Sequence, residues 1–147
     1  MCVSPTTWIA TPLGVRAIKD LRVGDDVYSV DHGETKSVPI IQIRRSAVEG
    51  HRVVRLSLEG GRALDVSASH PTADGRQIGD LKSGDVIDGV RIIGSNTVPY
   101  EHDATYDILP ASDTGAYFAA GVLIGSTLAQ TARLVETSTA PSSRLPP

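Results

Sequence analysis

A short internal repeat sets the strongest limit on how this chain of 147 residues folds. The segment Ile18-Lys-Asp-Leu-Arg-Val-Gly-Asp25 is matched by Ile78-Gly-Asp-Leu-Lys-Ser-Gly-Asp85. In each copy the leucine is an apolar anchor, the glycine permits a backbone with positive φ, and the last aspartate can bond nearby backbone amides. Two copies in nearly the same register predict two similar β subdomains, whereas a solenoid would need about three copies or more.

Short apolar segments separated by turn residues predict an all-β fold. The clearest hairpin signal is the Gly60-Gly61 pair, since apolar and polar residues alternate on both sides of it, in residues 56–58 and 64–66. Strands are expected at residues 7–10, 26–30, 38–44, 52–58, 62–66, 90–93, 105–109 and 116–119.

Composition excludes several classes of partner. A net charge of -3 and a sequence pI near 5.7 provide no basic field for nucleic acid. No run reaches the roughly 20 apolar residues that span a bilayer, and a single cysteine excludes an intramolecular disulfide. We expect a monomer that binds no nucleic acid and has no membrane span.

The amino-terminal residues, Met1-Cys-Val-Ser-Pro5, lack the charged start and apolar core of a signal peptide. Because Cys2 lies so close to the start, we expect the chain to be cut from a longer precursor, which the reading frame upstream of Cys2 would test. The compartment of that precursor, secreted or not, stays open.

The carboxyl end changes in composition. Residues 128–136 are expected to form a short helix, capped by Ser126 or Thr127, because their apolar residues gather loosely on one helical face. Residues 137–147 are rich in serine, threonine and proline, and they contain too little apolar surface to offset the entropy of ordering. We expect a disordered tail there.

Three features carry reactive side chains: Cys2, the segment Ser67-Ala-Ser-His70 and the segment Thr105-Tyr-Asp107. A fourth segment, Tyr117-Phe-Ala-Ala-Gly-Val-Leu-Ile-Gly-Ser-Thr127, follows them. Each alone has an ordinary interpretation: a terminal thiol, a histidine and serine in a turn, a solvated strand aspartate and a glycine turn.

In this order the segments resemble the blocks of the Hint (Hedgehog/intein) superfamily. The opening Cys2-Val-Ser-Pro-Thr-Thr-Trp-Ile-Ala-Thr-Pro-Leu-Gly14 is similar too, and the resemblance covers about residues 2–127. It is closer to bacterial intein-like and Hedgehog-like domains than to full inteins, because no insertion is long enough for a homing endonuclease. It implies a Hint autoprocessing domain over residues 1–127, a β horseshoe with pseudo-two-fold symmetry.

The resemblance also implies roles for four residues. Cys2 would attack the carbonyl carbon of the residue before it, converting an amide to a thioester in an N–S acyl shift. His70 would protonate the scissile amide nitrogen, and Asp107 would assist deprotonation of the thiol. Ser67 stands where the family has threonine, and would bond the scissile carbonyl oxygen or hold His70.

This chemistry needs such residue types. A free thiol has a pKa near 8.5, so only a small fraction is thiolate at neutral pH. An amide nitrogen leaves poorly until it is protonated, and a positioned acid or base contributes about 10²–10⁴-fold. A hydrogen-bond donor on the oxyanion can add a similar factor. Nucleophile and electrophile already belong to adjacent residues, which favours the reaction further.

The carboxyl end departs from the splicing pattern. Where inteins end in His-Asn before Cys, Ser or Thr, this chain has Gly125, Ser126 and Thr127. Ser126 has no carboxamide to cyclise, and Thr127 could accept the acyl group only as a branched product that could not resolve. We therefore expect cleavage without splicing, with an amino-terminal passenger in cis as substrate. Water is the default acceptor of the acyl group, and a small thiol, amine or alcohol is the alternative.

Two other interpretations stay open: a degenerate Hint fold serving as a non-catalytic binding or maturation module, and an unrelated β-sandwich or barrel. His51 and His102 are further candidates near the site. The run Glu101-His-Asp103 invites a metal interpretation, but the chain lacks the closely spaced Cys/His pairs of structural zinc sites. No cofactor and no metal is expected.

Overall fold

The computed structural model describes residues 2–129, and its regular secondary structure is almost entirely β-strand. In chain order the elements are β1 (Trp8–Thr11), β2 (Gly14–Ala17), η1 (Ile18–Asp20), β3 (Asp26–Asp31), β4 (Glu34–Ala47), β5 (Arg52–Leu58), β6 (Arg62–Val66), η2 (Ile78–Asp80), β7 (Val86–Ile87), β8 (Val90–Pro99), β9 (Ala104–Pro110), β10 (Tyr117–Ala119) and β11 (Val122–Ile124). The two η elements are single 3-10 turns. The all-β prediction is confirmed.

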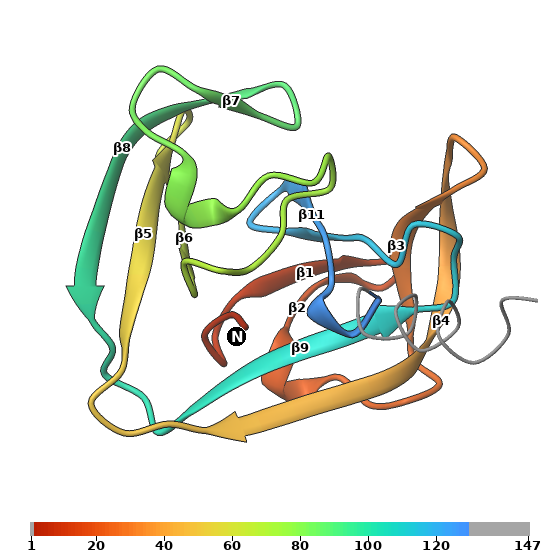
Figure 1. The fold of residues 1–147 in the computed structure, drawn as a ribbon. Helices are drawn as coiled ribbons and strands as arrows, with labels where there is room; N and C mark the ends of the chain where they lie inside the picture. The colour runs from red at the N-terminus through yellow and green to blue at the C-terminus, as the bar shows by residue number, and fades with distance from the viewer. Residues whose placement is uncertain (1, 130–147) are drawn as a thin grey trace, which may run out of the picture.

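Two long antiparallel pairs shape the molecule. β4 pairs with β9 and β5 pairs with β8, and Figure 1 shows the two pairs diverging from a common corner as the arms of a curled sheet. The shorter strands extend the arms, in the orders β3-β4-β9 and β6-β5-β8-β7, and the sheet β11-β10-β1-β2 lies between them. This is the horseshoe expected from the sequence.

The amino-terminal segment enters the space between the arms. Val3 forms isolated bridges with Val66 of β6 and with Tyr106 of β9, and Figure 1 places the amino terminus inside the curl. Val3 is therefore held between the two arms, and the residue before it is fixed beside them, with its carbonyl accepting the Ser67 N–H.

The internal repeat forms two equivalent turns. The N–H groups of Gly24 and Gly84 each donate to a strand carbonyl at 2.9 Å. Their φ angles are +98° and +95°, a conformation that favours glycine. The carboxylates of Asp25 and Asp85 accept the backbone N–H three residues before them, at 2.9 Å and 3.0 Å. The pseudo-two-fold prediction thus holds down to individual hydrogen bonds.

One apolar cluster joins the elements. Ile9, Leu56 and Ile108 come from different strands, and each has an exposed fraction of 0%. The alternation of apolar and polar residues that predicted β5 and β6 reflects this burial, and Leu56 pairs with Leu64 across the hairpin. The hairpin and both of its strand ranges are confirmed.

Several strands differ from the sequence expectation. β4 begins at Glu34 and runs through four exposed residues because its partner β3 supplies ladder hydrogen bonds there. β8 continues to Pro99 for the same reason, along β5. The short strands β2, β7 and β11 were not expected, since two to four residues carry little periodic signal.

A helix begins at Thr127, and Ser126 caps it by accepting the N–H of Leu128 at 3.1 Å. The structure describes no residue after 129, so the rest of the helix expected at residues 128–136 and the tail expected at residues 137–147 lie outside the described residues. Between residues 2 and 129, the structure contains no helix whose length and apolar character would let it cross a membrane.

Candidate functional site

Cys2 is enclosed by β6 and β9. Its exposed fraction is 0%, and its carbonyl accepts the N–H of Ser67 at 3.1 Å. The next residue, Val3, exchanges backbone hydrogen bonds of 2.8 Å and 2.9 Å with Tyr106. The single thiol of the chain is therefore presented to the interior, beside the buried face of β9.

The Ser67 hydroxyl lies against the backbone of Cys2. Its Oγ accepts the Cys2 N–H at 3.1 Å and donates to the Cys2 carbonyl oxygen at 3.2 Å. That N–H belongs to the peptide bond preceding Cys2, so the hydroxyl is on the nitrogen side of this bond. Its link to His70 is through the backbone, because the His70 N–H donates to the Ser67 carbonyl at 3.0 Å.

His70 is buried, and its ring faces the carboxyl-terminal segment. Nε2 lies 2.7 Å from the Gly125 carbonyl oxygen. Since a carbonyl only accepts, Nε2 is the donor in this contact. The Gly125 N–H in turn donates to the Pro71 carbonyl at 3.0 Å. His70 and Gly125 are thus held together by side chain and backbone, although 55 positions separate them.

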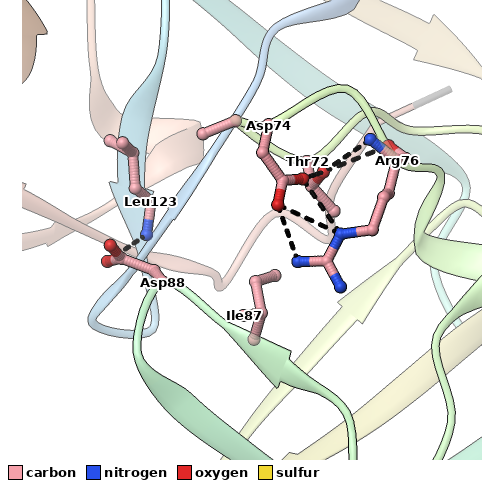
Figure 2. Close-up of a pocket in the computed structure, with 7 residues that line it drawn as sticks. Thr72, Asp74, Arg76, Ile87, Asp88 and Leu123 are labelled. Carbon is pink, nitrogen blue, oxygen red and sulfur yellow. Dashed lines mark hydrogen bonds and ion pairs between the residues drawn. The ribbon is translucent and has the colours of Figure 1, made fainter.

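A polar network supports the loop that carries His70. Thr72 forms a bridge with Ile124, next to Gly125, and its hydroxyl accepts the Arg76 N–H at 2.9 Å. Figure 2 shows the Arg76 guanidinium paired with the Asp74 carboxylate, with an Nε–Oδ1 distance of 3.0 Å. Hydrogen bonds from Arg76 and Thr72 lower the pKa of Asp74 to about 2. A cavity of about 210 Å³ adjoins this network and is lined by neither His70 nor Cys2.

Asp107 is buried on β9 and accepts several hydrogen bonds. Oδ1 accepts the Tyr117 hydroxyl at 2.6 Å and the Ile108 N–H at 2.9 Å. Oδ2 accepts the N–H of Thr127 at 2.8 Å and also the Thr127 hydroxyl. The carboxylate therefore ties β9 to β10 and to the start of the terminal helix. Burial and the nearby Asp107 charge raise the pKa of Tyr117, which keeps its phenol protonated.

Burial and the charge of Asp107 also raise the pKa of the Cys2 thiol. The Thr105 hydroxyl, two positions before Asp107 on the same strand, acts weakly in the opposite direction and lowers the pKa of the thiol. This hydroxyl is buried and has no hydrogen-bond partner among residues 2–129. An anion beside a buried thiol disfavours the resting thiolate, but it is suited to taking the proton while the sulfur attacks.

Of the four residues nominated from the sequence, the structure places only Ser67 and Cys2 in direct side-chain to backbone contact. Ser67 touches Cys2 directly, Asp107 acts on it through its charge, and His70 is joined to Ser67 by a turn. Sequence reasoning assigned no role to Thr105 or Tyr117 and considered Thr127 only as a helix cap or an acyl acceptor, although all three lie within the segments named from the sequence. The only signal in the sequence for these residues is that each carries a hydroxyl and lies in one of the named segments.

The two remaining candidate histidines have different surroundings. His51 Nε2 lies 3.3 Å from Ser67 Oγ. His102 is exposed and packs edge-on against Tyr100, with ring centroids 5.2 Å apart. Its neighbour Asp103 pairs with Arg45 at 3.7 Å. Within residues 2–129, the run Glu101-His-Asp103 forms no cluster of three ligand atoms that could hold a metal.

Comparison with solved structures finds the same architecture at low sequence identity. A bacterial intein-like domain from Clostridium thermocellum matches with a TM-score of 0.74 and 19% identity over 85% of this chain and 99% of that chain. The gp41-1 intein gives 0.66 and 21% over 84% and 97%. A DnaB intein from Synechocystis gives 0.66 and 13% over 85% and 97%. No protein-family model and no curated protein sequence matches the chain.

Proposed function

The chain has a Hint-superfamily fold, and from this premise we propose that it cleaves the peptide bond preceding Cys2 by an N–S acyl shift. The fold excludes the unrelated β-sandwich or barrel. The observation that carries the proposal is the contact of Ser67 Oγ with the Cys2 nitrogen, 3.1 Å in a fully buried setting. The Ser67 hydroxyl therefore lies at the atom that must be protonated when the amine leaves.

The proposed step moves one proton to Asp107 and one to nitrogen. As the thiol loses its proton to Asp107, the sulfur attacks the carbonyl carbon of the preceding residue and forms the C–S bond. The C–N bond then breaks, and the nitrogen leaves as the amine of Cys2 with a proton from the imidazolium form of His70, which becomes neutral, while the Ser67 hydroxyl stays beside the nitrogen. Water or a small external nucleophile afterwards takes the acyl group from sulfur.

Splicing is not part of the proposal. Gly125 contributes only its backbone, with its carbonyl on His70. The Ser126 hydroxyl caps the terminal helix, and it cannot cyclise as a carboxamide does. Nothing at these positions releases a carboxyl-terminal flank, so a branched ester on Thr127 would have no exit.

A passenger fused before Cys2 tests the proposal. Incubation with hydroxylamine should release the passenger as a hydroxamate, whose mass identifies a thioester intermediate, and incubation in buffer should release the free acid more slowly. Cys2→Ala should abolish both products while the far-ultraviolet circular dichroism spectrum, which reports the fold, stays unchanged. A second passenger placed after the chain should never be joined to the first. Release from Cys2→Ala at the unaltered rate would contradict the mechanism.

A non-catalytic binding or maturation role is the second candidate. The observation that favours it is that Thr127 occupies Asp107 Oδ2 with both its N–H and its hydroxyl, which leaves the base engaged. The raised pKa of the Cys2 thiol also favours a non-catalytic role, because it lowers the fraction of the nucleophilic thiolate. A fusion that stays intact for days at neutral pH, with and without hydroxylamine, would support this role over cleavage.

A further inference from the structure

The side chain of His51 has no role in the proposed cleavage, yet it contacts the hydroxyl at its centre. His51 lies in the connection between β4 and β5, and its side chain reaches Ser67 at the end of β6. The imidazole is half-buried, and Nε2 is 3.3 Å from Ser67 Oγ.

A hydroxyl has one proton to donate and two lone pairs to accept with. The Cys2 N–H occupies one lone pair of Ser67 Oγ, because an amide nitrogen only donates. The hydroxyl proton goes to the Cys2 carbonyl oxygen at 3.2 Å. One lone pair remains, and a donor at Nε2 of His51 fills it, so that all three hydrogen bonds of Ser67 are made.

The ring of His51 is fixed on its other side. Tyr100 packs edge-on against it, with ring centroids 5.7 Å apart, and the Tyr100 N–H donates to the His51 carbonyl at 2.9 Å. The Tyr100 hydroxyl donates to the Ala104 carbonyl at 2.5 Å, which holds the phenol ring. Burial raises the pKa of Tyr100, so this support is uncharged. A rigid aromatic therefore aims the imidazole at Ser67.

We propose that His51 is a positioning residue for the cleavage, holding the Ser67 oxygen on the scissile nitrogen while the hydroxyl proton turns toward it. This rests on the proposed function. As the C–N bond weakens, the nitrogen keeps its N–H and gains a lone pair that accepts a hydrogen bond until it is protonated, so the Ser67 proton turns from the Cys2 carbonyl toward the nitrogen. The Cys2 carbonyl keeps the Ser67 N–H at 3.1 Å, and the donor at Nε2 prevents the oxygen from drifting during this exchange.

The test compares first-order rates of hydroxylamine-induced release from the passenger fusion. We expect His51→Leu to slow release about 10- to 100-fold, the range for a misplaced reacting group. His51→Gln, whose amide can donate from a similar place, should stay within about threefold. The matched control is His102→Leu, on the other ring neighbour of Tyr100, which should leave the rate unchanged. Equal rates for His51→Leu and the unaltered fusion would overturn the proposal.

A double substitution separates positioning from a general structural effect. If His51 acts through Ser67, His51→Leu in a Ser67→Ala background should cause no further slowing beyond that of Ser67→Ala alone. A further loss as large as in the unaltered background would overturn the proposal.

The contact can also be tested without cleavage. The nuclear magnetic resonance signal of His51 Nε2–H should be observable in the folded chain and should shift in Ser67→Ala but not in His102→Leu. No shift in Ser67→Ala would contradict the contact. If the unaltered fusion releases nothing, the proposed function fails, and this signal still decides the contact.

Discussion

Replacing Asp107 by asparagine should separate the structural and chemical roles of this buried carboxylate. Oδ1 accepts the Ile108 N–H and Oδ2 accepts the Thr127 N–H. An amide has one oxygen, so whichever way Asn lies, its NH₂ faces one of these two backbone donors. One buried N–H then loses its acceptor, at a cost of about 1–3 kcal/mol in the free energy of unfolding. For a chain of this size, each kcal/mol lost lowers the midpoint of thermal unfolding by about 2–4 °C.

The effect on chemistry should be much larger than the effect on stability. Without the carboxylate to take the thiol proton, passenger release should slow by about 10²–10⁴-fold. The resting thiol should respond in the opposite sense. Asp107 raises the pKa of Cys2 through its charge, so Asp107→Asn should lower that pKa and increase the thiolate fraction at a given pH. A variant with more thiolate and less cleavage would distinguish a base from a group that merely stabilises the nucleophile.

The assays are thermal unfolding, passenger release and titration of the thiolate by its ultraviolet absorbance, taken as the difference from Cys2→Ala so that the four tyrosines cancel and only the single cysteine contributes. Tyr117→Phe is the matched control: it removes the 2.6 Å hydrogen bond to Oδ1 but keeps the carboxylate. It should lower the unfolding midpoint modestly and leave release within about tenfold. Equal loss of release in the two variants, or a Cys2 pKa that rises in Asp107→Asn, would refute the assignment of Asp107 as the base.

Three further predictions concern the fold. Gly24→Ala and Gly84→Ala should each lower the free energy of unfolding by about 1–3 kcal/mol, because both turns use a positive φ; urea titrations showing a loss at only one would contradict their equivalence. Leu56→Ala should cost about 2–5 kcal/mol, because the side chain is fully buried, and an unchanged urea midpoint would refute this. Asp74, whose pKa is lowered to about 2 chiefly by Arg76, should stabilise the fold above its unfolded pKa of about 3.9. That contribution should be lost as the pH falls through about 2, and the same acid dependence in Asp74→Asn would contradict it.

Local features of the sequence were sufficient for the elements that are specified locally. The Gly60-Gly61 hairpin could be predicted because its turn and its alternating flanks are contiguous. The repeated turns could be predicted because Gly84 and Asp85 repeat the chemistry of their counterparts, which needs no distant partner beyond one strand carbonyl. The extensions of β4 and β8 could not, because exposed polar residues join a strand only when a neighbour supplies the ladder.

For the site, the sequence by itself determined the nominated residue types and their order along the chain: a thiol, a hydroxyl with an imidazole, and a carboxylate. Only the tertiary structure decided which atoms meet. It put the Ser67 hydroxyl on the Cys2 nitrogen, His51 on that hydroxyl and Thr127 on Asp107. Such contacts depend on the register of β6 and β9 against the amino-terminal segment, and a shift of one residue would turn each side chain to the opposite face. No pattern along the chain records that register, because it is set by the packing of strands far apart in sequence.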